Sequence, residues 1–161
     1  MRKLLFSDTL ASDQDVGERL RSATTRWQTA AGEAELSAAA RDVVAAIFAA
    51  RQACASKENI DPLSTLSDDP TVTRELERVT AAFEKRCAED EKLTALVLIN
   101  PIRAFRDAGV EVAREVVPLI PLLYPRLPYS QDAYYDAERD GTQTLSWIQQ
   151  LQVVPHRPVL P

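Results

Sequence analysis

Hydrophobic residues recur at helical spacing over residues 33–58, and this is the clearest pattern in the chain. The segment contains neither Pro nor Gly, and ten of its 26 residues are Ala. Its apolar positions alternate between spacings of four and three, which places them on one side of an α-helix: Leu36, Ala40, Val43, Ile47, Ala50 and Cys54. Most of these side chains are small, so a second helix can approach closely. The pattern predicts an amphipathic helix over 33–57 that packs on other helices.

A second helical pattern precedes this segment. Ser12 or Asp13 suits the N-cap position, Asp15 falls in the first turn, and Gly32 suits the C′ position at the end. The apolar stripe of this helix is Val16, Leu20, Ala23, Trp27 and Ala31. Because its connection to the helix over 33–57 is short, the two are predicted to be antiparallel neighbours.

Two Pro-containing pairs predict the starts of further helices. In Asp69-Pro70 and Asn100-Pro101 the first residue caps the helix, and Pro takes the first helical position, where no N–H is needed. The first helix carries Val72, Leu76, Val79, Phe83 and Cys87, and Gly109 ends the second. The apolar run 93–99 between them should be buried. The charged stretch 84–92 reads as a solvated face or a helix junction.

The connecting segments have weaker signals. Residues 58–69 are rich in turn residues and predict a loop, with Leu63 and Leu66 tucked beneath it. Residues 110–112 fit either a short extended piece or the start of a helix that runs to Val117.

The character of the chain changes at Pro118, because seven of the ten prolines lie in the last 44 residues. Residues 118–129, PLIPLLYPRLPY, have Pro at every third or fourth position, which predicts an extended strap near polyproline II rather than a helix. A short helix is then expected from Ser130 to about Arg139. Residues 142–152 fit either a last short helix or a strand, and an irregular tail follows. The predicted organisation is a helical bundle over 1–117 and a second region, 118–161, packed on the bundle or on a partner.

Composition and charge narrow the class of protein. The chain has 161 residues, a net charge of −5 and 45% hydrophobic residues, values that suit one globular domain. Its acidic balance argues against a nucleic-acid partner, which needs a basic face. The longest apolar run, Leu96–Ile99, is too short for a membrane span, and the apolar run near residue 5 is too short for a signal peptide. We therefore expect a cytoplasmic protein without a membrane partner, and the excess of Arg over Lys suggests a bacterial source.

The sequence carries none of the common catalytic motifs. It lacks GxGxxG, GxxxxGK[ST], HExxH and GxSxG, and its single histidine, His156, lies between two prolines near the C-terminus. Cys54 and Cys87 each continue an apolar stripe, so they are predicted to be buried thiols rather than metal ligands. We expect no catalytic residue, no metal and no cofactor.

The apolar and aromatic residues of the C-terminal third are the best candidates for contact with a protein partner. Tyr and Arg are enriched where binding energy concentrates, and the strap is too apolar to be left in water. Tyrosines could also serve to hold the strap on the bundle. The candidate partner-binding residues are Leu119, Ile120, Leu122, Leu123, Tyr124, Arg126, Leu127, Tyr129, Tyr134 and Tyr135.

Residues 93–112, LTALVLINPIRAFRDAGVEV, resemble the leader-type helix of nitrile-hydratase-alpha-like precursors of ribosomally made, modified peptides. The resembling positions are Leu96, Asn100, Pro101, Ala104, Phe105, Ala108, Gly109 and Val110. The resemblance covers about 20 of the 161 residues and implies a precursor held by a modifying enzyme. Residues 113–161 depart from that family, since they have no Cys and no double Gly.

These observations predict an all-α fold, an antiparallel helical bundle followed by a Pro-rich extended strap and short helices. The expected function is a non-catalytic protein–protein interaction module, an accessory or adaptor subunit, and self-association into a homo-oligomer is compatible with it. One alternative is a precursor or leader-type substrate bound by a peptide-modifying enzyme. Another is a small enzyme that works with carboxylates and tyrosines alone.

Overall fold

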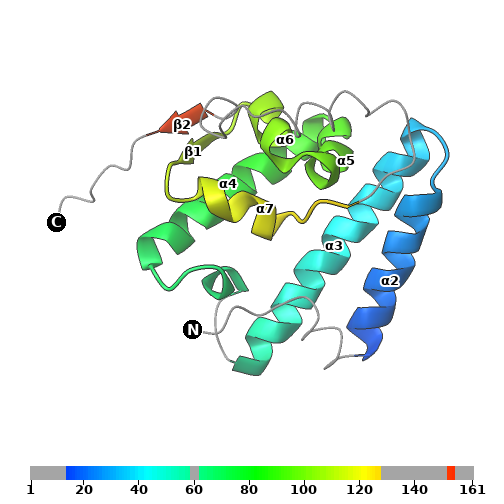
Figure 1. Ribbon diagram of the computed structural model, residues 1–161, viewed down its shortest axis with the longest axis horizontal. Coiled ribbons are helices and arrows are strands. Elements are labelled where there is room, and N and C mark those ends of the chain that lie inside the picture. The colour runs from blue at the N-terminus through cyan, green and yellow to red at the C-terminus, as the bar shows by residue number, and fades with distance from the viewer. Residues whose placement is uncertain (1–13, 59–61, 128–151, 155–161) are drawn as a thin grey trace.

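The computed structural model describes residues 14–58, 62–127 and 152–154, and in these residues the protein is mostly helical. The predicted all-α class is therefore confirmed at that level. The elements, in chain order (Figure 1), are α2 (Gln14–Thr29), α3 (Glu33–Glu58), η1 (Pro62–Thr65), α4 (Pro70–Glu89), α5 (Lys92–Ile99), α6 (Pro101–Ala108), β1 (Glu111–Ala113), η2 (Val117–Leu119), α7 (Ile120–Leu123) and β2 (Gln152–Val154).

Helices α2 and α3 lie side by side and run in opposite directions (Figure 1). The predicted stripe of α3 is buried at all six positions, and Ala23 and Trp27 of α2 are buried with it. Between the helices, Gly32 has a φ of 86°, a conformation that residues with a side chain rarely adopt. One detail of the prediction is wrong: α2 ends at Thr29, so Ala31 is exposed and Ala30 is buried instead.

Both predicted helix starts at Pro are confirmed. Asp69 accepts a hydrogen bond from the Thr71 N–H at 2.8 Å, and Asn100 accepts one from the Arg103 N–H at 3.1 Å. These side chains satisfy N–H groups that have no partner inside the first turn. Gly109 ends α6 in the left-handed conformation, with a φ of 69°.

Helix α5 lies in the centre of the core, as the apolar run 93–99 predicted, because every residue from Leu93 to Ile99 is buried. Beside it, the rings of Phe83 and Phe105 stack with centroids 4.4 Å apart and planes only 7° from parallel. This pair joins α4 to α6 in the middle of the domain.

The described residues contain one small sheet, in which β1 and β2 pair in parallel. Val112 lies opposite Val153, and Ala113 opposite Val154. The extended alternative for residues 110–112 is confirmed in β1. For residues 142–152, the strand alternative is the one found at Gln152, and the predicted irregular tail is wrong at Val153 and Val154. Parallel pairing joins segments that are distant in sequence, so no local sequence pattern predicts it.

The prediction that residues 118–129 are extended is wrong for the first part of that segment. Pro118 lies in the first turn of η2 and Pro121 in the first turn of α7. Proline is tolerated there because first-turn N–H groups have no helical acceptor, so a spacing of three permits two short turns in succession. The chain becomes extended at Tyr124, the residue before Pro125, with φ −123° and ψ 91°.

Several expectations concern parts of the chain outside the described residues. These are the N-cap at Ser12 or Asp13, the end of the Pro-rich segment at 128–129, the helix over 130–139, most of the segment 142–152, and the tail after Val154. Among the described helices, none combines the length and the apolar character that a bilayer-spanning segment needs.

Candidate binding surface on the Pro-rich segment

Three side chains anchor the Pro-rich segment to the helical core. Ile120 and Leu123 of α7 are fully buried, and Tyr124 keeps only 1% of its surface exposed. A fourth tie is made by the backbone, because the Leu127 N–H donates to the carbonyl oxygen of Leu98 at 2.7 Å. The segment is therefore attached to the core at several points between Ile120 and Leu127.

Tyr124 occupies the centre of an aromatic cluster. Its ring centroid lies 5.7 Å from that of Phe48, 5.4 Å from that of Phe83 and 5.8 Å from that of Phe105. The first two contacts are edge-to-face, an arrangement that aromatic rings favour. Residues of α3, α4 and α6 thus converge on one tyrosine from the Pro-rich segment, so Tyr124 has the structural role that sequence reasoning offered for these tyrosines.

Arg51 of α3 binds the C-terminal end of α7 through hydrogen bonds. Its Nη2 donates to the carbonyl oxygens of Leu122 at 3.0 Å and of Leu123 at 3.4 Å. Its guanidinium carbon also lies 5.5 Å from the centroid of the Phe48 ring, within cation–π range. Burial lowers the pKa of Arg51 from its ordinary value, while Tyr124 acts in the opposite direction. An arginine stays charged in a protein, so these are hydrogen bonds from a charged donor.

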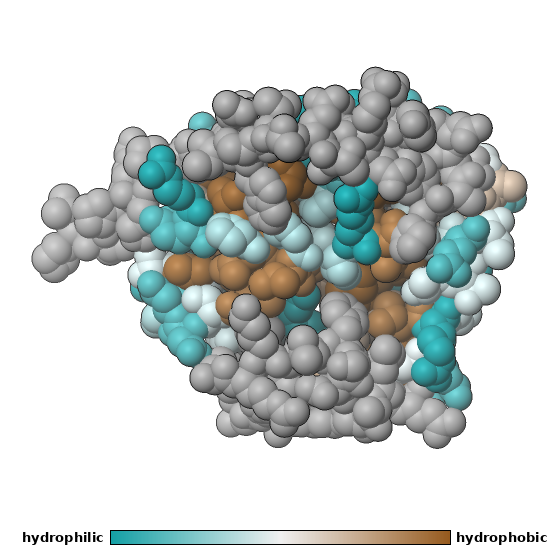
Figure 2. Space-filling view, viewed as in Figure 1, coloured by the Kyte–Doolittle hydropathy of each residue, from teal (hydrophilic) through white to brown (hydrophobic). Residues whose placement is uncertain are grey.

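Four side chains of the Pro-rich segment keep exposed surface, and together we call them the outer face of this segment: Leu119, Leu122, Arg126 and Leu127. Leu119 and Leu127 also pack against the core. Leu122 is 43% exposed, the only large hydrophobic residue in the described part of the chain that is classed as exposed. Arg126 is exposed, and Leu119 and Leu127 are half-buried. Figure 2 shows hydrophobic residues across the middle of the face that carries α7 and α3.

The structure divides the candidate partner-binding residues into two groups. One group is buried in the core and cannot contact a partner: Ile120, Leu123 and Tyr124. The other group, the outer face, is accessible to solvent. Tyr129, Tyr134 and Tyr135 lie outside the described residues. Arg51 is not among the residues that the sequence singled out. Its role depends on α7, which arrives from far along the chain, so no signal in the sequence around Arg51 could have found it.

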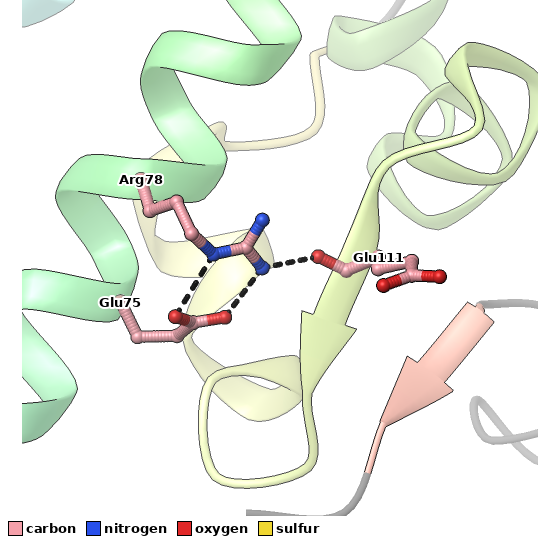
Figure 3. Close-up of polar contacts among 3 residues, drawn as sticks. All are labelled: Glu75, Arg78 and Glu111. Atoms are coloured by element: carbon pink, nitrogen blue, oxygen red, sulfur yellow. Dashed lines mark hydrogen bonds and ion pairs between the residues drawn. The ribbon is translucent and has the colours of Figure 1, made fainter. Parts of the chain in front are cut away.

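A second polar cluster joins α4 to β1 (Figure 3). Arg78 makes two parallel contacts with the Glu75 carboxylate, Nε to Oε2 at 3.0 Å and Nη2 to Oε1 at 2.5 Å, and Nη2 also donates to the Glu111 carbonyl oxygen at 2.6 Å. The hydrogen bond to Glu75 is the main reason why the pKa of Arg78 is raised. The cluster holds the start of β1 against α4, which is a structural role.

Within the described residues, no three His, Cys, Asp or Glu side chains come together as a metal site requires. No protein family model matches the chain, and neither a curated protein nor a solved structure shows significant similarity to it.

Proposed function

We propose that this protein is a non-catalytic helical protein–protein interaction module, an accessory or adaptor subunit, and that it contacts its protein partner through the outer face of the Pro-rich segment. The observation that carries the proposal is the position of Leu122. It is a 43% exposed leucine whose next neighbour in the chain, Leu123, is buried. A single exposed leucine is common on protein surfaces, so the proposal depends on Leu122 together with the half-buried Leu119 and Leu127 of the same ordered segment.

Rigidity is what distinguishes this segment from an ordinary surface loop. Pro118 and Pro121 restrict the backbone, Ile120 and Leu123 anchor it, and Arg51 binds the carbonyl oxygens at the end of α7. A partner that binds a pre-ordered segment immobilises little further chain, so less of its contact energy is lost to entropy.

The chemistry of the outer face indicates the kind of partner surface. Apart from Arg126 the outer face is apolar: Leu122 is exposed, and Leu119 and Leu127 are half-buried against the core. A complementary surface would offer a shallow apolar depression for Leu122.

The packing of residues 93–112 disfavours the precursor alternative. A modifying enzyme would have to hold residues 93–112, but Leu96, Ala104 and Phe105 within that segment are buried. Presenting them would require α5 and α6 to leave the centre of the core. This cost favours the interaction module over the precursor.

The test is photo-crosslinking with the full chain in its native host. A photoreactive phenylalanine replaces Leu122, and a matched chain carries it at Glu77, an exposed position of α4. We expect one dominant protein adduct from position 122 and none of the same mass from position 77. Excess untagged wild-type chain should suppress the adduct, whereas excess Leu122→Asp chain should not.

Mass spectrometry of the adduct then identifies the partner, and an adduct with a second copy would identify the chain itself. Equal products from the two positions, or no protein adduct from position 122, would contradict the proposal.

A further inference from the structure

Two polar groups are buried without a hydrogen-bond partner where the Pro-rich segment meets the core. They are the Nη1 group of Arg51 and the hydroxyl group of Tyr124, and neither has a partner among the described residues. Arg51 is 9% exposed and Tyr124 is 1% exposed, so water does not replace the missing partner while the segment lies on the core. Burial of a polar group without a partner costs free energy that hydration would return.

The charge of Arg51 adds to this cost. Its Nη2 donates to the carbonyl oxygens of Leu122 and Leu123, and no carboxylate of the described residues pairs with its guanidinium. A buried charge is normally paired with an opposite charge, because neutral partners replace only part of its hydration. The closed position of the Pro-rich segment therefore keeps a cation incompletely solvated.

Apolar contacts oppose this cost and hold the segment on the core. Ile120 and Leu123 are fully buried, and the ring of Tyr124 contacts three phenylalanine rings. The Leu127 N–H also donates to a carbonyl oxygen of α5. Favourable packing and unsatisfied polar groups thus meet in one short stretch, residues 118–127, and the polar groups leave this stretch less firmly held than its apolar burial alone implies.

The chain is tied down on both sides of this stretch. β1 precedes it, β2 follows it, and the two strands pair in parallel (Figure 1). The helices that contact the ring of Tyr124 are α3, α4 and α6, and each of them also packs against α5. Residues 118–127 can therefore leave the core while the flanking strands stay paired and the helices stay packed.

We infer that residues 118–127 open as a unit in a minor population of the folded protein, and that hydration of Arg51 and of the Tyr124 hydroxyl favours the open state. In the closed state the Pro-rich segment presents its outer face. In the open state it no longer holds Leu122 in that position, and Arg51 becomes accessible. The fold thus contains a two-state element that switches the outer face off, a conformational property that lies beyond the proposed interaction function and does not depend on it.

Native-state hydrogen exchange of the full-length ¹⁵N-labelled chain tests the inference. When closing is faster than exchange, the protection of an amide measures how rarely its hydrogen bond opens. The N–H of Tyr124 donates within α7 and the N–H of Leu127 donates to α5, whereas the N–H of Asn100 donates to Leu96 inside the core. We expect equal protection at Tyr124 and Leu127, roughly tenfold or more below that at Asn100 and less sensitive to low concentrations of urea.

Removing one unsatisfied group should close the segment. Tyr124→Phe deletes the hydroxyl and keeps the ring, so the protection of Leu127 should rise by roughly fivefold or more. Trp27→Phe is the control, because it weakens a buried contact of α2, on the opposite side of α3 from α7 (Figure 1). The control should leave the protection of Leu127 unchanged.

A chemical probe follows the opening at Arg51 itself. Phenylglyoxal adds to arginine side chains, and peptide mass spectrometry separates the reaction at the buried Arg51 from that at the exposed Arg19. Tyr124→Phe should slow the reaction of Arg51 by the same factor by which it slows amide exchange at Leu127, because both reactions need one opening. The rate at Arg19 should not change.

Three results would overturn the inference. The first is equal protection of Leu127 and Asn100 with the same dependence on urea, since the segment would then open only when the whole domain unfolds. The second is a Leu127 protection that Tyr124→Phe leaves unchanged or that Trp27→Phe lowers. The third is an Arg51 reaction rate that does not fall in Tyr124→Phe.

Discussion

Arg51 reaches from α3 to the carbonyl oxygen of Leu122, 71 residues further along the chain, and its Nη2 lies 3.0 Å from that oxygen. The bond joins α3, the longest helix among the described residues, to the Pro-rich segment. The last carbonyls of a helix have no partner inside it, so the guanidinium satisfies groups that would otherwise be desolvated on the core side.

Replacing Arg51 by Met should therefore loosen α7. The variant keeps much of the volume but loses charged donors to two carbonyl oxygens, and we expect a loss of about 1.5–3 kcal/mol in the free energy of unfolding. Arg19→Met, at an exposed position of α2, is the control and should stay within about 0.5 kcal/mol of wild type. Urea denaturation measures both, and equal midpoints for the two variants would contradict the role given to Arg51.

The adjacent residues Leu122 and Leu123 should respond oppositely to the same substitution. Leu122→Asp places a carboxylate in solvent and should change the free energy of unfolding by no more than about 0.5 kcal/mol. Leu123→Asp places it in the core without a partner and should cost more than about 4 kcal/mol, enough to unfold many domains. Circular dichroism during thermal unfolding distinguishes them. If Leu123→Asp melts like wild type, α7 does not pack as described.

Truncation of the α3 stripe at Ile47 should be costly. The side chain is 2% exposed, and Ile47→Ala should lower the free energy of unfolding by about 2–5 kcal/mol through lost burial and the cavity left behind. Gln52→Ala, at an exposed position of the same helix, should lie within about 0.5 kcal/mol of wild type. Chemical denaturation decides the matter, and an Ile47→Ala midpoint equal to that of wild type would contradict burial of the stripe.

Removing only the hydroxyl of Tyr124 should not destabilise the fold. The oxygen has no hydrogen-bond partner among the described residues, so Tyr124→Phe deletes a desolvated polar atom while keeping the three aromatic contacts. We expect the free energy of unfolding to stay the same or to rise by up to about 1–3 kcal/mol. Tyr124→Ala, which also removes the ring, should instead cost about 3–5 kcal/mol. A destabilised Tyr124→Phe would show that the hydroxyl is satisfied in solution.

Cys87 should react slowly with alkylating reagents in the folded protein. Burial, only partly offset by the hydrogen bond to Thr94, raises the pKa of its thiol to about 11 from a usual 9.0, so little thiolate is present at pH 8. In a Cys54→Ala background, the iodoacetamide rate should rise steeply only as the pH nears 11, and urea should accelerate it at pH 8. A fast native reaction at pH 8 would contradict the shift.

The raised pKa of Cys87 also makes the free energy of unfolding depend on pH. The folded state holds the Cys87 proton more firmly than the unfolded state, so the stabilisation is complete below pH 9 and is lost as the pH rises toward 11. The pKa of Tyr124 is also raised, which extends the loss to higher pH. Denaturation midpoints of wild type should fall over this range more than those of a Cys87→Ala, Tyr124→Phe double variant.

The helices and their ends could be predicted because the information is local. The spacing of Leu36, Val43 and Ile47 places them on one side whatever α3 packs against, and the capping groups of Asp69 and Asn100 act on N–H groups within three residues. The run from Leu93 to Ile99 carries no charge, and burial follows from that alone.

The Pro-rich segment shows where local reasoning fails. Each proline forbids the interior of a helix but permits its first turn, so the same residues allow a polyproline strap or two short turns. Packing decided between them, because only the turns bring Ile120, Leu123 and Tyr124 to one side, where the core buries them. The parallel pairing of Val112 with Val153 was likewise settled by contacts between distant segments.

Sequence alone determined that α2, α3, α4 and α6 are helical, where α4 and α6 begin, and which stripe of α3 faces inward, because these depend on interactions within one or two turns. Tertiary structure alone decided that Arg51 caps α7 and that Leu122 rather than Leu123 faces outward. It also placed Tyr124 between three phenylalanines, with a hydroxyl that has no hydrogen-bond partner among the described residues. These relationships join residues dozens of positions apart. Their energies come from desolvation and close packing, which exist only once the elements have met.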